Sequence, residues 1–400
     1  MKVIFIGSFY PEKLYAKIRK SSLVGIDDAS NNFQRSLILG FKTHYIDFQV
    51  ITCPFTRTFP KHNKNWRHRF YKLLENDTPI FSLPYLNIFL LNHLTKIVSV
   101  ILAIRKFIFI NQNLLIYIYS LHTPFIIPAI LLKLTNKEKV KICLIVPDLQ
   151  ENMTSNKSLI FLFFKNIDKL ITSFLIKYVD SFVLLTDLMK NKLELVNKPY
   201  IVVEGICNNT NQYTSSDKLP NTVMYSGSLD IRYGIDILLD SFSHINDSKV
   251  ELLICGDGDM RNQIKEYSLI NDQIKYLGHL PNCQVLELQR KVSLLVNPRP
   301  SKDLFTLYSF PSKIIEYLNS GTPTIMFKLP GIPEEYFDYC FVPSDETSDS
   351  LAREIIKVIN MDNEFLNKFG LSASNFVKSK KNNIIQTERI KKLNSIFYER

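Results

Sequence analysis

The sequence predicts two α/β domains, each built on an open, doubly wound parallel sheet of the Rossmann-like kind. The chain has 400 residues, which is too long for one ordinary hydrophobic core. Short runs of apolar, β-branched and aromatic residues alternate with longer helical patterns in both halves of the chain. Apolar strands separated by helices are typical of parallel sheets that helices cover on both faces.

Each half of the chain contains five expected strands. In order they are 2–7, 48–52, 114–119, 141–146, 181–185, 222–226, 250–254, 274–277, 293–296 and 324–327. A largely polar stretch with Pro and Gly and no helical period separates the two halves. We therefore expect an N-terminal domain at 1–196, a linker at 197–220, a C-terminal domain at 221–375 and a last helical segment at 376–400.

Composition excludes several classes of protein. Hydrophobic residues make up 46% of the chain and charged residues 22%, which is typical of a globular protein. The six cysteines show no C-x-x-C pair and no histidine at metal spacing, so reduced thiols in a cytoplasmic protein are expected rather than disulfides or zinc. The first apolar run is too short for a signal peptide and is expected to be a strand.

Two apolar stretches, 83–110 and 159–176, are each interrupted by ionisable side chains and are therefore poor spanning helices. The formal net charge of +11 favours a nucleic acid, an anionic membrane surface or a phosphorylated substrate as partner. The chain contains no nucleic-acid-binding motif, so nucleic acid is not expected.

The most informative segment is YSFPSKIIEYLNSGTP at 308–323. Pro311 suits the first turn of a helix, and Ser312 and Lys313 add a hydroxyl and a cation beside its free N–H groups. Such a helix start can bind a diphosphate, and Glu316, one turn later, can accept hydrogen bonds from a ribose diol. An ordinary capped helix with a solvent-facing glutamate would show the same pattern.

The segment YSFPSKIIEYLNSGTPTI resembles the donor-binding segment of the family 4 (group 1) retaining glycosyltransferases, especially their polysaccharide-assembly type. That family has the GT-B fold, in which two Rossmann-like domains face a cleft. The resemblance implies that Glu316 binds the nucleotide ribose. Tyr308 stands where the family usually has a first glutamate, and Asp303 is a nearby carboxylate that could substitute for it.

A second segment, YSGSLDIRYGIDILL, resembles the family's glycine loop and places Gly227 at the donor. Ser228 and Tyr233 stand where the family has an arginine and a lysine for the pyrophosphate. Arg232 and Arg299 are the candidate replacements, because an arginine fork suits phosphate oxygens. Arg232 could equally be a solvated loop charge.

Two further glycines complete the expected donor site. Gly256 matches the family's glycine-rich turn, although any tight turn could use it, and Gly278 would border the nucleobase. The turn also contains one D-x-D sequence, Asp257-Gly-Asp259, of the kind that a metal-dependent transferase would use near the diphosphate. We expect it to serve the turn, and no metal ligand is assigned.

The N-terminal half resembles the family more loosely. Residues 25–37 resemble its acceptor-side loop, with Asn31 and Asn32 near a helix start, and a plain polar cap is the alternative. Asp148 follows a strong strand at the place of the family's H-D loop beside the reacting sugar. A helix cap is the alternative role for Asp148.

The expected reaction moves a sugar from a nucleotide diphosphate to a saccharide or lipid-linked acceptor, with retention and without a metal or other cofactor. Asp148, Arg299 and Lys313 are the candidate catalytic residues, and the two cations would stabilise the departing diphosphate. By analogy with the family, the last helix would cross back to the first domain.

The expected location is the cytoplasm, with peripheral contact at the inner face of the membrane. Residues 156–178 combine Leu, Ile and Phe with lysines and could lie on an anionic membrane, or could simply cover the first sheet. Two other functions remain open. They are a sugar-nucleotide epimerase of the same fold and a non-catalytic nucleotide-sugar-binding subunit.

Overall fold

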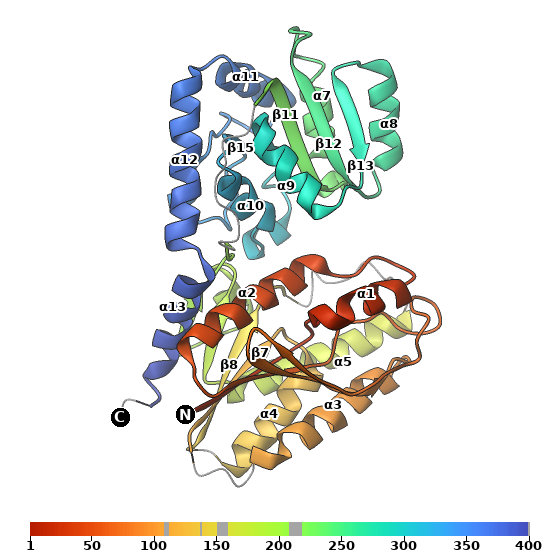
Figure 1. Ribbon diagram of the computed structural model, residues 1–400, viewed down its shortest axis with the longest axis vertical. Coiled ribbons are helices and arrows are strands. Elements are labelled where there is room, and N and C mark those ends of the chain that lie inside the picture. Colours follow the sequence, from red (N-terminus) through yellow and green to blue (C-terminus); the bar gives the residue numbers. More distant parts are fainter. Residues whose placement is uncertain (108–111, 137, 150–158, 208–217, 399–400) are drawn as a thin grey trace. The chain divides into compact units, whose positions relative to one another are not determined.

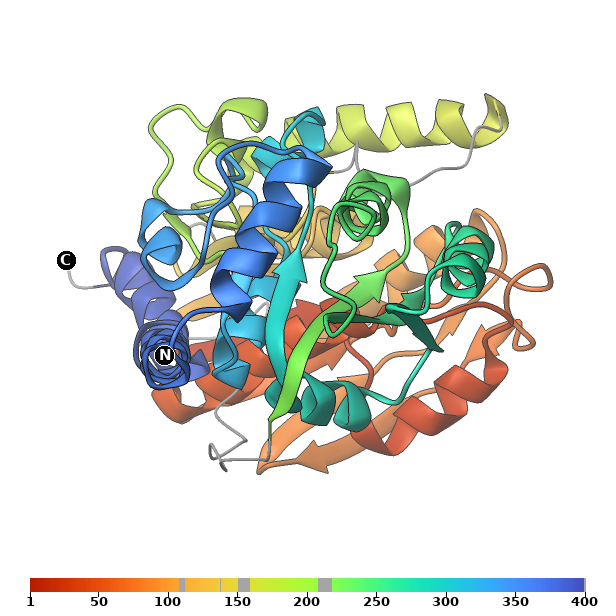
Figure 2. The same cartoon turned by 90° about the horizontal axis from the view of Figure 1, so that it is seen from above.

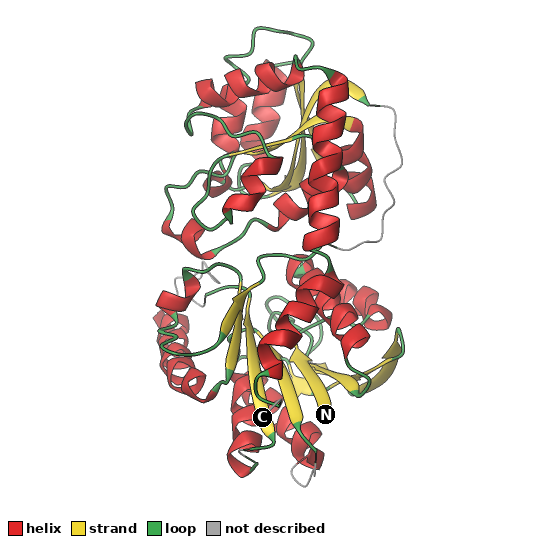
Figure 3. Ribbon diagram, turned by 90° about the vertical axis from the view of Figure 1, so that its left-hand side faces the viewer, coloured by secondary structure: helices red, strands yellow, loops and turns green. Residues whose placement is uncertain are grey.

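The computed structural model describes residues 1–107, 112–136, 138–149, 159–207 and 218–398. The chain forms two compact units, which are described separately. Unit 1 comprises Met1–Ile206 and Asn383–Arg400, and unit 2 comprises Cys207–Asn382. In each unit helices lie on both faces of a mainly parallel sheet (Figures 1 and 3). The predicted class of two Rossmann-like α/β domains is therefore confirmed.

The sheet of unit 1 has the strand order β10-β9-β8-β7-β1-β2-β5-β4, and β4 is antiparallel to β5. Its strands are β1 (Lys2–Gly7), β2 (Phe48–Thr52), β4 (Tyr71–Glu75), β5 (Thr78–Ser82), β7 (Leu114–Tyr119), β8 (Val140–Val146), β9 (Ser181–Leu184) and β10 (Tyr200–Val202). A separate short ribbon pairs β3 (Arg67–His68) with β6 (Tyr85–Leu86). The principal helices are α1 (Glu12–Ser21), α2 (Asp28–His44), α3 (Leu91–Ile104), α4 (Thr123–Thr135), α5 (Leu159–Leu175), α6 (Met189–Lys192) and α13 (Asn383–Ser395).

The centre of this sheet is apolar on both faces. Every residue of β7 is buried, as expected for a strand that helices cover on both sides. On one face the ring of Phe41 from α2 stacks on Tyr117 with centroids 4.1 Å apart, and the hydroxyls of Tyr45 and Tyr117 hydrogen-bond at 2.7 Å. Burial and aromatic packing thus fix α2 against the sheet.

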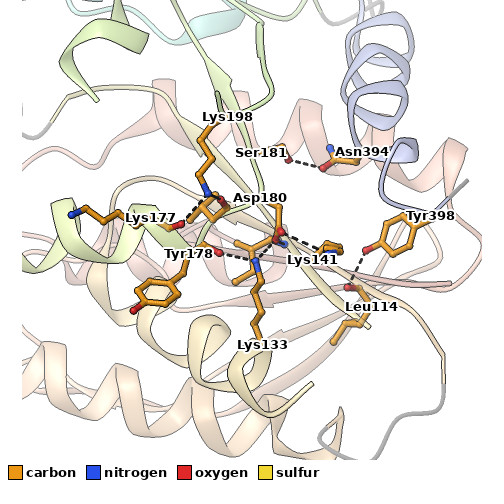
Figure 4. Close-up of polar contacts among 12 residues, drawn as sticks. Leu114, Lys133, Lys141, Lys177, Tyr178, Asp180, Ser181, Lys198, Asn394 and Tyr398 are labelled. Carbon is orange, nitrogen blue, oxygen red and sulfur yellow. Dashed lines mark hydrogen bonds and ion pairs between the residues drawn. The ribbon is translucent and has the colours of Figure 1, made fainter. Parts of the chain in front are cut away.

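The C-terminal helix α13 belongs to unit 1, where it packs against α2 and the edge of the sheet (Figure 1). The hydroxyl of Ser181 donates to Asn394 Oδ1 at 2.6 Å, and that of Tyr398 donates to the carbonyl of Leu114 at 3.2 Å. Figure 4 shows these contacts beside a network around Asp180, whose Oδ2 accepts from Lys133 Nζ at 2.7 Å. The chain therefore returns to its first unit through specific polar contacts.

The sheet of unit 2 is wholly parallel, with the order β13-β12-β11-β14-β15 (Figure 2). Its strands are β11 (Leu219–Ser228), β12 (Glu251–Asp257), β13 (Ile274–Gly278), β14 (Val292–Asn297) and β15 (Thr324–Met326). Its helices are α7 (Ile235–Ser241), α8 (Arg261–Ile270), α9 (Asn282–Lys291), α10 (Ser312–Ser320), α11 (Ser348–Ile359) and α12 (Asn363–Lys380), with short 3-10 turns η4 (Ile231–Tyr233), η5 (Leu304–Tyr308) and η6 (Glu334–Tyr339).

All ten strands expected from the sequence are present. Within the expected linker 197–220, residues Tyr200–Val202 form the edge strand β10, Leu219 begins β11, and 208–217 lie outside the described residues. The segment 156–178 forms α5 and a following 3-10 turn, Ile176–Tyr178, in its described part. No helix in the described parts of the chain is both long and apolar enough to cross a membrane.

Candidate functional site

The candidate site of unit 2 lies where parallel strands end, which is where ligands bind in sheets of this type. Gly227, the penultimate residue of β11, lies beside Gly256 of β12, and the two are paired in register. At Gly256 φ is +152°, and a Cβ there would lie 1.8 Å from the carbonyl oxygen of Gly227. Only glycine therefore fits at position 256, where β12 approaches the end of β11 closely. Gly278, at the end of β13, has open space around its Cα.

A second close approach joins the start of α7 to the loop after β14. At Gly234 φ is +74°, and a Cβ would lie 1.9 Å from the carbonyl oxygen of Pro298. This contact brings η4, which contains Arg232 and Tyr233, beside Arg299. Arg232 and Arg299 are 67 positions apart in the sequence, and the fold brings them together.

The two candidate arginines lie on the same pair of aromatic rings. The Arg299 guanidinium lies 4.4 Å from the ring centre of Phe305 and 5.2 Å from that of Tyr233. The Arg232 guanidinium lies 5.9 Å and 6.0 Å from the same two centres. Arg299 is buried and donates to Ser309 Oγ at 2.9 Å, whereas Arg232 is exposed and pairs with Asp230 at 2.6 Å. Two fixed cations in one place are suited to phosphate oxygens.

Helix α10 begins directly after Pro311, which is its N-cap residue, and ends at Gly321 in the left-handed conformation. Ser312 is therefore the first helical residue, and Pro311, expected in the first turn, lies just before it. The apolar side chains Ile314, Ile315 and Leu318 are buried, which fixes the helix on the sheet. The positive end of the helix dipole thus lies with Ser312 and Lys313.

Glu316 is held in a hydrogen-bonded network and does not point freely to solvent. Its Oε1 accepts from Lys313 Nζ at 2.6 Å and from Gln289 Nε2 at 2.6 Å. Gln289 Nε2 also donates to Ser226 Oγ at 2.9 Å. Because Ser226 precedes Gly227, this network ties the carboxylate to the end of β11.

Lys313 also links α10 to the neighbouring strand. Burial raises the pKa of the Cys255 thiol on β12, and a hydrogen bond with the backbone of Leu280 and the charge of Lys313 lower it less. Cys255 pairs in register with Gly278 and precedes Gly256. The structure therefore gathers Gly227, Gly256, Gly278, Lys313 and Glu316 at one edge of the sheet.

Tyr308 and Asp303 delimit η5, the turn between the arginine loop and α10. Asp303 is the N-cap residue of that turn, and its charge raises the pKa of the Arg232 guanidinium together with the stronger effect of Asp230. Tyr308 is partly buried at the last position of the turn. Asp303 thus lies on the arginine side of the site.

The remaining candidate residues belong to unit 1. Asn31 is buried in α2, and its Oδ1 accepts from the backbone N–H of Tyr10 at 2.8 Å, so this amide fixes the loop after β1. Asn32 is exposed. Asp148, just after β8, is exposed, and its charge raises the pKa of the Tyr119 phenol, which burial raises most. The Tyr119 hydroxyl in turn accepts from Ser30 Oγ at 3.2 Å, so Asp148 and the start of α2 share one neighbour.

Among the described residues, no group of three or more His, Cys, Asp and Glu side chains is placed to hold a metal ion. Asp257 Oδ1 accepts from the backbone N–H of Gly258 at 3.0 Å, so this carboxylate serves the glycine turn.

Two residues that support the site escaped the sequence analysis as functional candidates. Gln289, on α9, donates a hydrogen bond to Glu316, and the Tyr317 hydroxyl accepts one from the backbone N–H of Ser226 at 2.8 Å. Tyr317 stands beside Glu316 in the recognised motif, so its position was a usable signal. Gln289 gave no such signal, because only the packing of α9 against α10 brings it there.

Comparison with known proteins gives a family match for unit 2. Residues 209–376 match the family model described as glycosyl transferases group 1. No curated protein matches the chain in sequence.

Solved structures share the fold over the whole chain. Sucrose-phosphate synthase from Thermosynechococcus elongatus is 13% identical with a TM-score of 0.65, covering 100% of this chain and 99% of that one. Anabaena HepE in complex with UDP is 13% identical with a TM-score of 0.62, covering 99% and 100%. A Staphylococcus aureus TarM mutant in complex with fondaparinux, alpha-GlcNAc-glycerol and UDP is 10% identical with a TM-score of 0.63, covering 100% of both chains. Unit 2 thus matches the group 1 glycosyltransferase model over residues 209–376, and the whole chain shares the GT-B fold of these proteins.

Proposed function

We propose that this protein transfers a sugar from a nucleotide diphosphate donor to a saccharide or lipid-linked acceptor. The observation that carries the proposal is the network Lys313–Glu316–Gln289 at the start of α10, next to the glycine edge of β11 and β12. A helix N-terminus with an adjacent lysine binds phosphate, and a fixed carboxylate can accept from two ribose hydroxyls. The solved structures with the same fold include complexes with UDP.

In the proposed mechanism the protein stabilises the diphosphate as it leaves the sugar. Arg299 is held by Ser309 and by two aromatic rings, so it needs little reorganisation when negative charge develops. Arg232 and Lys313 would add two further positive charges. Asp148 is proposed to contact the reacting sugar or the acceptor hydroxyl.

Three finer parts of the proposal rest on the resemblance of the FPSK segment to the polysaccharide-assembly transferases. They are retention at the anomeric carbon, a role in cell-surface polysaccharide synthesis, and independence from metal ions. Transfer in the presence of a chelator, with the product anomer assigned by NMR, would test the first and third directly.

The test of the reaction itself is incubation of the protein with UDP-, GDP- and ADP-sugars and an acceptor mixture. A transferase releases the nucleoside diphosphate only with acceptor present and forms a new glycoside. A free, interconverted sugar nucleotide without acceptor would instead identify an epimerase. Release of no nucleotide with any donor would favour the non-catalytic subunit.

We further propose that unit 1 contacts an anionic membrane through its helices α3, α4 and α5, with α4 packed between the other two. Large apolar side chains are exposed on all three, among them Leu94 and Leu102 on α3, Leu131 on α4, and Leu170 and Phe174 on α5. Apart from Asp168, which accepts from Thr123, the three helices contain no Asp or Glu, and two lysines of α5, Lys165 and Lys169, are partly or fully exposed. An apolar face with positive charge is suited to anionic lipid.

A further inference from the structure

A cavity of about 390 Å³ lies within unit 1, and none of the candidate site residues assigned above lines it. Helix α1 forms one wall, through residues such as Leu14 and Lys17, and the chain from Thr56 to Tyr71 forms most of the rest. Its volume falls in the range of small-molecule sites, roughly 300–1,000 Å³. Because α1 follows β1 and the second wall follows β2, the cavity lies beyond the carboxyl ends of these strands.

Backbone hydrogen bonds hold the walls together. The N–H of Lys64 donates to the carbonyl of Ser21 at 2.9 Å, and the N–H of Leu23 donates to that of His62 at 3.0 Å. The N–H of Asn87 donates to the carbonyl of Trp66 at 2.6 Å. The cavity is therefore part of the folded unit, built by the segment that carries β3 and β6.

The lining is cationic. Lys17, Arg67 and Arg69 line the cavity, and none of the described residues that line it is an Asp or Glu. His68 also lines it, but burial lowers its pKa to about 4, so it is neutral at pH 7. Arginine forks bind carboxylates and phosphates in two-point contacts. An anionic ligand is thus favoured over a neutral or cationic one.

The lining is also aromatic and rich in amides. Trp66 is 46% exposed, and the Arg67 guanidinium lies 5.0 Å from its ring centre. Asn63 is 1% exposed, and its Nδ2 has no hydrogen-bond partner among the described residues, while its Oδ1 accepts from the N–H of Asn65. A buried amide donor without a partner is costly, and an acceptor atom entering beside it would remove that cost. A flat aromatic ring with adjacent amides suits the apolar face and hydroxyls of a pyranose.

We propose that this cavity binds an acidic saccharide. Its ring packs on Trp66, and its carboxylate or phosphate is held by Arg67, Arg69 and Lys17. This inference rests on the proposed function. The ligand is then the acceptor itself, or the negatively charged sugar of a longer acceptor.

The chain offers a site-specific signal, because Trp66 is its only tryptophan. The experiment is titration of the full-length protein, followed by Trp66 fluorescence, with a glucuronosyl-glucose disaccharide, its uncharged counterpart cellobiose, glucose 6-phosphate and inorganic phosphate. We expect a saturable change in Trp66 fluorescence with the acidic sugars, whose affinity should be at least about tenfold higher than that of cellobiose. A fluorescence response to only one of the two acidic sugars, the uronate or the sugar phosphate, also supports the site. It then identifies which acidic group the cavity binds.

Two variants sharpen the result. Arg67→Gln/Arg69→Gln should weaken the acidic sugar at least about tenfold, whereas Arg105→Gln/Lys139→Gln, which removes two exposed charges outside the cavity, should not. Thermal unfolding confirms that both variants are folded. Any one of four results would overturn the proposal. They are equal affinity for cellobiose and the uronate, binding of inorganic phosphate as tight as that of glucose 6-phosphate, competition by UDP at Trp66, and no fluorescence response at millimolar concentration.

Failure here remains distinguishable from failure of the donor site. Nucleotide binding is measured by calorimetry on the same protein and depends on Glu316 in unit 2. UDP binding without any Trp66 response would therefore reject the acidic-saccharide cavity and leave the proposed transferase intact.

Discussion

The carboxylate of Glu316 owes its position to a residue from another helix. Gln289 is fully buried, its Nε2 donates to Glu316 and Ser226, and its Oε1 has no hydrogen-bond partner among the described residues. A buried amide that is only half satisfied is poor for stability, and its Nε2 holds Glu316, so we assign Gln289 a positioning role.

Gln289→Leu is therefore expected to weaken nucleotide binding about tenfold while changing the free energy of unfolding by less than about 1 kcal/mol. The leucine removes the donor to Glu316 and also the unsatisfied Oε1. Calorimetry with the nucleotide and urea denaturation would measure the two effects. Gln263→Leu, an exposed change on α8, is the matched control. Unchanged affinity in Gln289→Leu would remove Gln289 from the site.

A second residue-scale prediction concerns Lys96, which is 2% exposed and whose ammonium lies 4.6 Å from the ring centre of Tyr85. Burial lowers its pKa to about 8. In the unfolded chain Lys96, with a pKa of about 10.4, therefore binds more protons between these two pH values, so the contribution of Lys96 to stability rises with pH across this window. Below pH 8 the folded protein bears the full cost of the buried charge.

Lys96→Met should raise the free energy of unfolding at pH 7 by about 1–3 kcal/mol, and this gain over the wild type should shrink between about pH 8 and 10. Denaturant unfolding at pH 7 and 9.5 checks both statements. Lys139→Met, at an exposed position, should leave the pH profile unchanged. A less stable Lys96→Met protein at pH 7 would show that the ammonium is favourably placed.

At the scale of elements, the loops at the carboxyl edge of unit 2 depend on glycine for different reasons. Gly234 and Gly278 have nearly the same φ, +74° and +73°. A Cβ at position 234 would collide with the carbonyl of Pro298, whereas nothing lies within 4 Å of one at position 278.

Gly278→Ala should therefore lower the free energy of unfolding only by the conformational strain, about 1 kcal/mol. Gly234→Ala should lower it by about 3 kcal/mol or more. The larger effect would also displace η4 from Arg299. Thermal and urea unfolding of the two variants form the comparison. Equal destabilisation would mean that the contact between Gly234 and Pro298 contributes nothing.

The strands could be predicted because each is a buried apolar run between helices. β1 and β7, for example, are buried along nearly their whole length. The strands β3 and β6, at the ends of the segment 67–86, were not predicted, because each is only two residues long and they form a ribbon through pairing alone. That segment forms much of the cavity around Trp66, so the periodicity of the sequence could not predict this part of unit 1.

The donor residues could be predicted only where a local motif carried them. The segment around Glu316 was recognisable, and Gly256 is required by a close approach that a strand-end glycine suggested. The pairing of Arg232 and Arg299 on the same two rings, and the bond from Gln289 to Glu316, arise from tertiary packing between distant segments. No sequence spacing encodes such contacts.

At the scale of the whole molecule, the net charge of +11 and the exposed apolar side chains of α3, α4 and α5 lead to one prediction. Leu170 is 72% and Phe174 is 57% exposed on α5. Leu170→Ser/Phe174→Ser should reduce cosedimentation with anionic vesicles at least about tenfold, because each change removes roughly 1.5–3 kcal/mol of burial in lipid.

The matched control is Leu269→Ser/Ile270→Ser, which changes two side chains exposed to 86% and 85% on α8 of unit 2. This variant should bind vesicles as the wild type does. Equal loss in both variants would mean that apolar exposure in general, and not the face of unit 1, causes the binding. No binding of the wild type to vesicles would refute the membrane proposal.

The central claim is that the edge of unit 2 binds the nucleotide of a sugar donor through Glu316. The most direct measurement is calorimetric titration of the full chain with UDP, GDP, ADP and CMP in a chelator, with Glu316→Ala and the exposed Glu287→Ala as a matched pair. The account predicts that one nucleotide binds, that Glu287→Ala retains the binding, and that Glu316→Ala weakens it at least about tenfold. Binding that is unaltered in Glu316→Ala, or no binding of any nucleotide, would contradict it.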